Sequence, residues 1–305
     1  MVSRADLTEG RFSAYGVSAF KLLGYLDSKL DITTGYPREP SWGYAFTYAA
    51  AQSASGPAFS DLAAKSCAHM AAQDTGIPDY PWEFVVYALQ QAGASDVYNV
   101  PAHLQGYHEK GTRMFNWFLL RMLNRNLCGE FSFTDLLKLR AGREIYQRPN
   151  GLIQDELKTR SLQYHAFCLF LLAELIESGL NRPWIIDWFI SGVKFSVRHV
   201  LPDGTALYLG RGQEQIFGYG ALIYALEYFN SRFERVEDQV LTSIWARLRS
   251  FQRDDGSFPL VLRQRCAEAA DLCSSSNLPA GWYGYNSLWD YQPFLAYCFL
   301  KTLKL

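Results

Sequence analysis

The sequence lacks the features that mark several large classes of protein. Its net charge is −1 over 305 residues, and nucleic-acid binding would require a basic face, so we expect no nucleic-acid partner. No run approaches the roughly 18 apolar residues of a membrane span, so we expect no membrane insertion. Residues 1–12, MVSRADLTEGRF, lack the apolar core of a signal peptide. Together these absences predict a soluble chain.

Cysteine motifs and linkers are missing as well. The six cysteines follow neither CxxC spacing nor a Cys/His ligand pattern, which favours buried free thiols over a disulfide framework and predicts no metal site. Nothing in the sequence calls for a cofactor. No Ser/Gly-rich, Pro-rich or charged run marks a domain boundary, and the 49% of hydrophobic residues can fill one large core. We therefore expect a single domain over 1–305 and make no prediction of its oligomeric state.

Helical periodicity dominates the chain, and no segment alternates at period two for more than about five residues. Breakers such as Gly56-Pro57 and Pro149-Asn150-Gly151 separate the periodic segments. The predicted helices cover 12–26, 42–53, 58–73, 81–93, 108–126, 133–142, 154–178, 183–199, 213–230, 234–252 and 286–303.

These helices are of two kinds. The segments 166–176 and 216–229 are apolar nearly all round, which indicates burial on more than one side. The helix over 234–252 instead carries an ordinary charged face. Inner helices surrounded by outer amphipathic ones give this mixture. The sequence therefore predicts an all-α fold, an (α/α) toroid or incomplete barrel of about five or six helical hairpins.

The stretch LRSFQRDDGSFPL (248–260) is similar to the Q-x-x-D-G-S-W/F turn of toroidal terpene cyclases and protein prenyltransferases. Cyclase chemistry would need an acidic DxDD motif, which the sequence lacks. Prenyltransferase chemistry would need zinc, and no histidine follows Asp271 and Cys273 to complete such a site. We therefore interpret the turn as an indication of toroid architecture alone.

Aromatic residues are abundant, at 15%, and they gather in short stretches that also contain polar residues. The stretches are EPSWGYAFTY, GYHEKGTRMFNWF and GWYGYNSLWDYQPF. One interpretation is a core of rings whose polar tips are satisfied. The other is a cleft whose rings stack on the apolar faces of sugars, and the composition does not separate the two.

Residues 150–179, NGLIQDELKTRSLQYHAFCLFLLAELIESG, resemble the second conserved block of alginate lyase-type polysaccharide lyases. In that block an acidic residue and a leucine precede an arginine-bearing turn, and an A-L-x-Y-H-x-F/Y-A-L helix ends in A-E-L. The matched positions are Glu156, Leu157, Arg160, Leu162, Tyr164, His165, Phe167, Leu169 and Ala173-Glu174-Leu175. The resemblance implies a toroid that binds an acidic polysaccharide or oligosaccharide, in the periplasm or outside the cell.

The resemblance also implies roles for individual residues. Tyr164 would act on the substrate ring as proton donor or base, and Arg160 or Arg211 would hold the uronate carboxylate. His165 is a third catalytic candidate, although it diverges from Tyr164 by about 100° on a helix and would otherwise be a core histidine bonded to a backbone carbonyl. The family's first block, an N-N-H tripeptide, has no counterpart, and the nearest position offers Asn116 without a following histidine.

Elimination at a uronate explains why such residue types would gather. Removing the proton on C5, next to a carboxylate, requires that Arg, Asn or Gln neutralise the carboxylate charge. A Tyr or His then acts as base and a Tyr protonates the leaving oxygen, with no need for a metal.

A second stretch, LPDGTALYLGRGQEQIFGYG (201–220), contributes further candidates for substrate binding. Its flanking glycines expose Arg211 at the start of a predicted helix, where charge and free N–H groups favour an anion. The alternative is an arginine in a tight loop that pairs with a neighbouring acid. The substrate-binding candidates are Arg211, Gln213, Tyr219, Asn116, Tyr285 and Asn286, the last of which could also be a simple N-cap.

The sequence thus predicts a polysaccharide lyase-like enzyme that cleaves an acidic, uronate-containing glycan by metal-independent β-elimination. Two alternatives stay open. A toroidal glycoside hydrolase would need two carboxylates facing one bond, for which Asp203 and Asp290 are candidates. A non-catalytic glycan-binding or polysaccharide-biosynthesis accessory protein would account for the missing N-N-H block.

Overall fold

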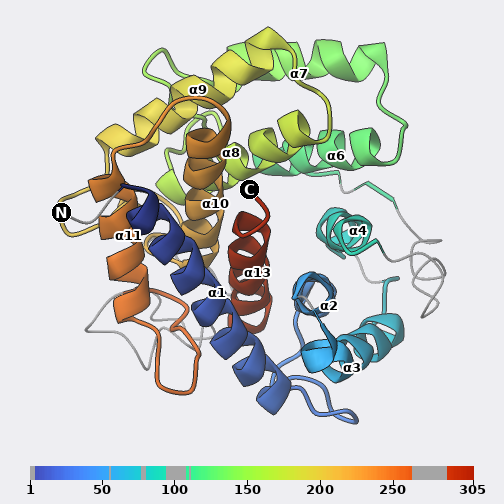
Figure 1. The fold of residues 1–305 in the computed structure, drawn as a ribbon. Helices are drawn as coiled ribbons and strands as arrows, with labels where there is room; N and C mark the ends of the chain where they lie inside the picture. The colour runs from blue at the N-terminus through green and yellow to red at the C-terminus, as the bar shows by residue number, and fades with distance from the viewer. Residues whose placement is uncertain (1–3, 55, 77–79, 94–107, 110, 263–286) are drawn as a thin grey trace.

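The computed structural model describes residues 4–54, 56–76, 80–93, 108–109, 111–262 and 287–305, and its regular elements there are helices. With the labels of Figure 1 they are α1 (Arg4–Lys29), α2 (Gly43–Ser53), α3 (Ser60–Ala72), α4 (Trp82–Gln91), α6 (Phe115–Leu127), α7 (Phe133–Tyr146), α8 (Leu162–Glu177), α9 (Pro183–Arg198), α10 (Ile216–Arg232), α11 (Asp238–Ser250) and α13 (Leu288–Thr302). A short 3-10 turn, Pro57–Phe59, precedes α3. The all-α prediction is confirmed.

Six of these helices form an inner ring. Contacts run from α2 through α4, α6, α8 and α10 to α13, and α13 closes the ring by packing against α2. Figure 1 shows α13 near the middle of the molecule, with α10 on one side and α2 on the other.

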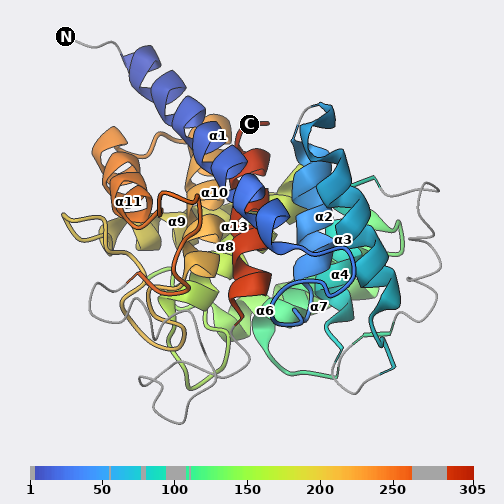
Figure 2. The ribbon, with the colours of Figure 1, turned by 90° about the horizontal axis from the view of Figure 1, so that it is seen from below.

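The other helices pack on the outside of this ring. Helix α3 packs against α2, α7 against α6, α9 against α8, α11 against α10 and α1 against α13. In Figure 2 the long α1 lies across the outside of the molecule, and its N-terminal end extends beyond its neighbours. Five inner helices thus have an outer partner among the described residues, and the prediction of a toroid built from helical hairpins is confirmed.

The two kinds of helix occupy the predicted layers. In α8 every residue from Leu162 to Ile176 is buried, and in α10 every residue from Ile216 to Phe229. Outer helices such as α11 bury only a stripe of residues toward the ring. Burial on all sides is what an inner helix needs, because it meets two ring neighbours, an outer helix and the axis.

Two predicted helices begin seven or eight residues later than expected. Helix α8 starts at Leu162 rather than near 154, because the Ser161 hydroxyl accepts a hydrogen bond from the N–H of Tyr164 and caps the helix. Arg160 therefore precedes the helix and shares no helical face with Tyr164.

Helix α6 starts at Phe115 rather than at 108. Asp155 fixes this start, since its carbonyl accepts the N–H of Phe115 (2.9 Å) and its carboxylate accepts the N–H of Asn116 (3.0 Å). Asp155, which lies in the segment before α8, thus caps α6, the helix next to α8 in the ring.

Helix α2 is capped in the same way by the last helix. Asp290 is 1% exposed, and its carboxylate accepts the backbone N–H groups of Ser41 (3.2 Å), Trp42 (2.8 Å) and Gly43 (2.7 Å). Burial raises the pKa of Asp290 to about 6, although the three N–H groups act in the opposite direction. Gly43 allows the contact, since a Cβ there would collide with the backbone of Trp289. Asp290 therefore joins the two ends of the ring.

We predict that Asp290→Ala lowers the free energy of unfolding by about 2–4 kcal/mol, because it removes an N-cap and leaves buried N–H groups without an acceptor. Urea unfolding followed by circular dichroism measures this. Asp187→Ala, on the exposed face of α9, is the matched control and should change stability by less than about 0.5 kcal/mol. Equal losses in the two variants would contradict the role given to Asp290.

Candidate functional site

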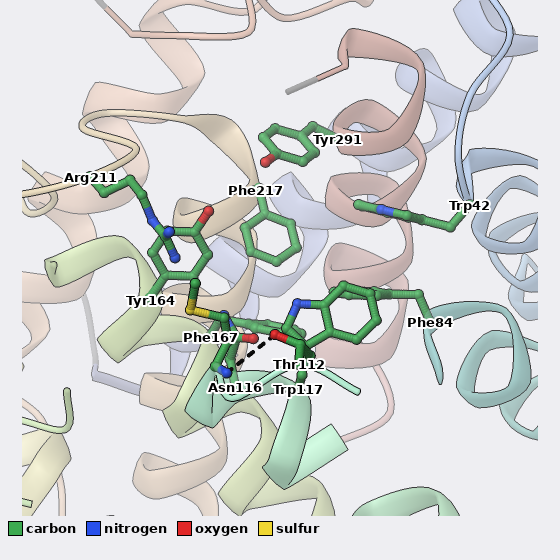
Figure 3. A pocket seen from close by; sticks show the side chains of 11 residues that line it. Trp42, Phe84, Thr112, Asn116, Trp117, Tyr164, Phe167, Arg211, Phe217 and Tyr291 are labelled. Atoms are coloured by element: carbon green, nitrogen blue, oxygen red, sulfur yellow. Dashed lines mark hydrogen bonds between the residues drawn. The ribbon is translucent and has the colours of Figure 1, made fainter. Parts of the chain in front are cut away.

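A pocket of about 280 Å³ lies at the end of the ring where the inner helices begin. Every inner helix contributes to it, either from its first two turns or from the residue that precedes it. The pocket is lined by Trp42, Phe84, Thr112, Met114, Asn116, Trp117, Tyr164, Phe167, Arg211, Phe217 and Tyr291 (Figure 3).

This position makes the electrostatic potential in the pocket more positive, which favours a negatively charged group. A helix carries about half a positive charge at its N-terminus, and six such ends converge here. Asp155 and Asp290 offset part of this charge at α6 and α2, but neither lines the pocket. Among the described lining residues there is one guanidinium, that of Arg211, and no carboxylate.

Five rings, four of them on inner helices and the fifth that of Trp42 just before α2, form a closed circuit that lines the pocket. Trp42 stacks on Phe84 with ring centroids 4.9 Å apart, and Phe84 stacks on Phe167 at 5.5 Å. Phe217 lies 4.8 Å from Phe167 and stacks on Tyr291 at 4.9 Å. Tyr291 lies 5.9 Å from Trp42 and completes what we call the aromatic circuit. Flat apolar surfaces of this kind suit the C–H faces of sugars.

Tyr164 and Arg211 form the polar wall of the pocket. The guanidinium carbon of Arg211 lies 4.3 Å from the centroid of the Tyr164 ring, so the cation covers one face of the phenol. Arg211 also donates to the carboxylates of Asp155 (2.6 Å) and Glu156 (2.9 Å). Arg211 thus pairs with neighbouring acids, as one interpretation expects, and also lines the pocket. That it binds an anion stays a prediction.

Asp155, the buried partner in this ion pair, is 2% exposed. Burial raises its pKa to about 6, against the opposing effects of the Asn116 N–H and of Arg211. The backbone around Arg211 is held by two glycines with positive φ, Gly210 (86°) and Gly212 (75°). A Cβ on Gly210 would collide with the carbonyl of Arg160, so the loop needs glycine to lie this close to the start of α8.

Tyr219 and Gln213 lie outside the pocket lining. Tyr219 is completely buried, and its hydroxyl donates to Glu214 at 3.0 Å, while Arg247 donates to the same carboxylate at 2.6 Å. Glu214 has a positive φ of 56°, which this cluster stabilises. Tyr219 therefore supports the fold of the loop that carries Arg211, and Gln213 lies half-buried within that loop.

His165 points away from the pocket. Its Nδ1 accepts the backbone N–H of Ile153 (3.0 Å), and its Nε2 lies 3.1 Å from the carbonyl oxygen of Gly192. With Nδ1 accepting, the tautomer that donates from Nε2 satisfies both nitrogens. Burial lowers the pKa of His165 to about 4. The structure thus gives this residue the core role that the sequence left as its alternative.

The remaining candidates divide in the same way. Asn116 lines the pocket and is 3% exposed, whereas Arg160 is exposed and is not part of the lining. Tyr285 and Asn286 lie outside the described residues. The structure thus brings together Tyr164, Arg211 and Asn116 and separates them from His165 and Arg160.

Sequence reasoning did not single out the residues of the aromatic circuit or Asp155. The signal was present in part, since Trp42 and Tyr291 belong to two of the three aromatic stretches noted above. Each stretch stands at the start of a predicted helix, which is where a toroid places its pocket. Asp155 directly precedes Glu156, and the resemblance to the lyase block singled out Glu156 instead.

Two further properties concern the described residues. No three histidine, cysteine or carboxylate side chains among them gather as a metal ion would require. None of the described helices combines the length and apolar character that crossing a membrane demands.

Comparison with known proteins places the fold. No family model and no curated sequence matches the chain. Cellobiose 2-epimerase from Spirochaeta thermophila superposes with a TM-score of 0.68 at 13% identity, over 99% of this chain and 97% of that one.

Two other solved structures are similar. A polysaccharide lyase superposes with a TM-score of 0.62 at 13% identity, over 96% of this chain and 97% of that one. A glycosyl hydrolase of family 88 from Bacteroides vulgatus has a TM-score of 0.62 at 12% identity, over 95% and 99%. At these identities the likeness establishes the (α/α) toroid and nothing finer.

We predict that the stability contributed by neutral His165 is lost as the pH falls from 6.5 towards 4. The pKa of His165 is lowered in the folded state, so the unfolded chain binds the extra proton in this window and acidification favours unfolding. The effect amounts to about 3 kcal/mol at most. Urea unfolding across the pH window should show wild type losing its advantage over His165→Gln, and a constant difference would contradict the assignment.

Proposed function

We propose that the protein is a carbohydrate-active enzyme that binds an acidic, uronate-containing glycan in this pocket and cleaves it by β-elimination. The observation that carries the proposal is the pairing of Arg211 with Tyr164 at six converging helix N-termini, in a lining whose described residues include no carboxylate. Such a site favours an anion and offers a phenol for proton transfer. The resemblance of residues 150–179 to alginate lyase-type enzymes supports the same chemistry.

The reaction needs two proton transfers and a neutralised carboxylate. The base takes the proton from C5, a double bond forms between C4 and C5, and the bond from C4 to the glycosidic oxygen breaks. That oxygen leaves with a proton from an acid. We assign one of these transfers to the Tyr164 hydroxyl, which Figure 3 shows on the pocket side of α8. The hydroxyl of Tyr291, on the wall formed by α13, lies at the same pocket.

We assign the neutralisation of the substrate carboxylate to Arg211. Its ion pairs with Asp155 and Glu156 fix the guanidinium over the Tyr164 ring before substrate arrives, so little side-chain entropy is lost on binding. Asn116 can contribute its carboxamide to the same carboxylate, as the family resemblance implies.

The hydrolase alternative is less well supported. Hydrolysis needs two carboxyl groups about 5 to 9.5 Å apart across the scissile bond. Of the candidates for this role, Asp203 is exposed and accepts hydrogen bonds from Thr205, while Asp290 caps α2 inside the core. Phenol and guanidinium groups at the described lining favour elimination over hydrolysis.

We predict that Tyr164→Phe lowers the turnover of a cleaved glycan by about 10² to 10⁴, because it removes the hydroxyl that transfers the proton and keeps the ring under Arg211. Alginate and polygalacturonate are the first substrates to test, with the ultraviolet absorbance of the unsaturated uronate as readout. Tyr208→Phe removes a hydroxyl outside the pocket lining and should keep full activity.

The assay separates the three candidate functions. Elimination creates the absorbing double bond, hydrolysis releases reducing ends without it, and a non-catalytic binder does neither. Full activity in Tyr164→Phe would show that the proton-transfer group lies elsewhere. Reducing ends without absorbance would replace the lyase by the hydrolase.

A further inference from the structure

The axis of the toroid is filled beneath the pocket. Phe294, which is completely buried, lies under the aromatic circuit with its ring 4.6 Å from Phe217, 5.9 Å from Phe167 and 6.1 Å from Trp42. Its ring also packs on Phe46 and Phe170, which come from α2 and α8. The side chain of one inner helix thus closes the centre that the circuit surrounds.

A second layer blocks the axis at the level of Glu174, whose side chain is 3% exposed. Tyr87 of α4 donates to its carboxylate at 2.7 Å, Lys301 of α13 pairs with it at 2.9 Å, and Tyr224 of α10 also donates to it. Four inner helices therefore meet in one buried polar network. Breaking it would leave a buried charge without partners, so the layer is not a gate.

The pocket is therefore a dead end with its mouth on the side of the helix N-termini. Its volume of about 280 Å³ lies just below the range of about 300–1,000 Å³ that pockets for drug-sized ligands span. A space of this size admits about one sugar ring. A polymer could thread neither past the aromatic circuit nor through the layer of Glu174.

We propose that the pocket receives the terminal sugar of an acidic glycan, so that the enzyme recognises and shortens chains from one end. This inference rests on the proposed function for the identity of the ligand and goes beyond it in assigning the mode of recognition. The terminal ring packs against the aromatic circuit, its carboxylate faces Arg211, and its glycosidic bond leads back to the mouth past Tyr164.

The test is binding as a function of chain length. Trp42 and Trp117 line the pocket, so the fluorescence of tryptophan reports its occupation. Fractions of alginate or polygalacturonate with equal mass and different mean length are titrated into Tyr164→Phe, which keeps the ring and is slow to cleave. The apparent affinity per unit mass should rise in proportion to the number of chain ends.

The size of the first products gives a second readout with the wild-type enzyme. Action from a chain end releases mono- or disaccharides from the start, while the viscosity of the polymer falls slowly. Affinity that depends on mass alone, or an early mixture of long fragments, would overturn the inference and leave elimination intact. Affinity that follows chain ends without any double bond would overturn elimination and leave the inference intact. No binding in any fraction would overturn both.

A pair of variants on α10 tests the aromatic circuit itself. Phe217→Leu removes one ring of the circuit and should weaken binding of the shortest bound oligosaccharide about tenfold. Phe229→Leu changes a ring on the same helix that packs on Phe189 and Phe233, away from the pocket, and controls for the stability loss. Equal affinities in the two variants would show that the aromatic circuit is not part of the binding site.

Discussion

All six inner helices begin at the pocket, and the N–H groups of their first turns must find acceptors there. The acceptors come from other parts of the ring as often as from the helix itself. Asp155 serves α6 and Asp290 serves α2, while Ser161 and Ser287 cap their own helices, α8 and α13. These caps fix the first residue of α2, α6, α8 and α13. They thereby fix which side chain of each of these helices faces the pocket.

The caps also explain the distribution of charge around the site. Two carboxylates buried behind the lining have pKa values raised to about 6, because desolvation outweighs the N–H groups that they accept. Arg211 compensates one of them, Asp155, and the same guanidinium extends over Tyr164. Charge is thus kept at the edge of the pocket, and the aromatic circuit is free of it. The pocket thus presents an apolar surface with one guanidinium in its wall.

Some of the site was predictable from short patterns and some was not. Glycines on both sides of Arg211 indicated a loop that exposes this residue before a helix, and Arg211 lies at the pocket in the loop that precedes α10. Tyr164 and His165 differ by one position, and only the rotation of α8 in its setting decides their roles. Both ring nitrogens of His165 pair with backbone groups, Nδ1 with the N–H of Ile153 before α8 and Nε2 with the carbonyl of Gly192 on α9. The carbonyl of Gly192 on α9, which pairs with Nε2 of His165, lies outside residues 150–179, so no pattern within that segment could reveal it.

The sequence by itself determined the helix content, the breaks between helices and the division into inner and outer layers, because these follow from local periodicity and burial. The tertiary structure decided which helix ends meet. Among the described residues, α2, α6, α8 and α10 are each followed by an outer helix that returns the chain, so the next inner helix begins at the same end of the ring. Trp42 and Tyr291, almost 250 positions apart, become neighbours for this reason. The aromatic circuit exists only because the ring closes between α13 and α2.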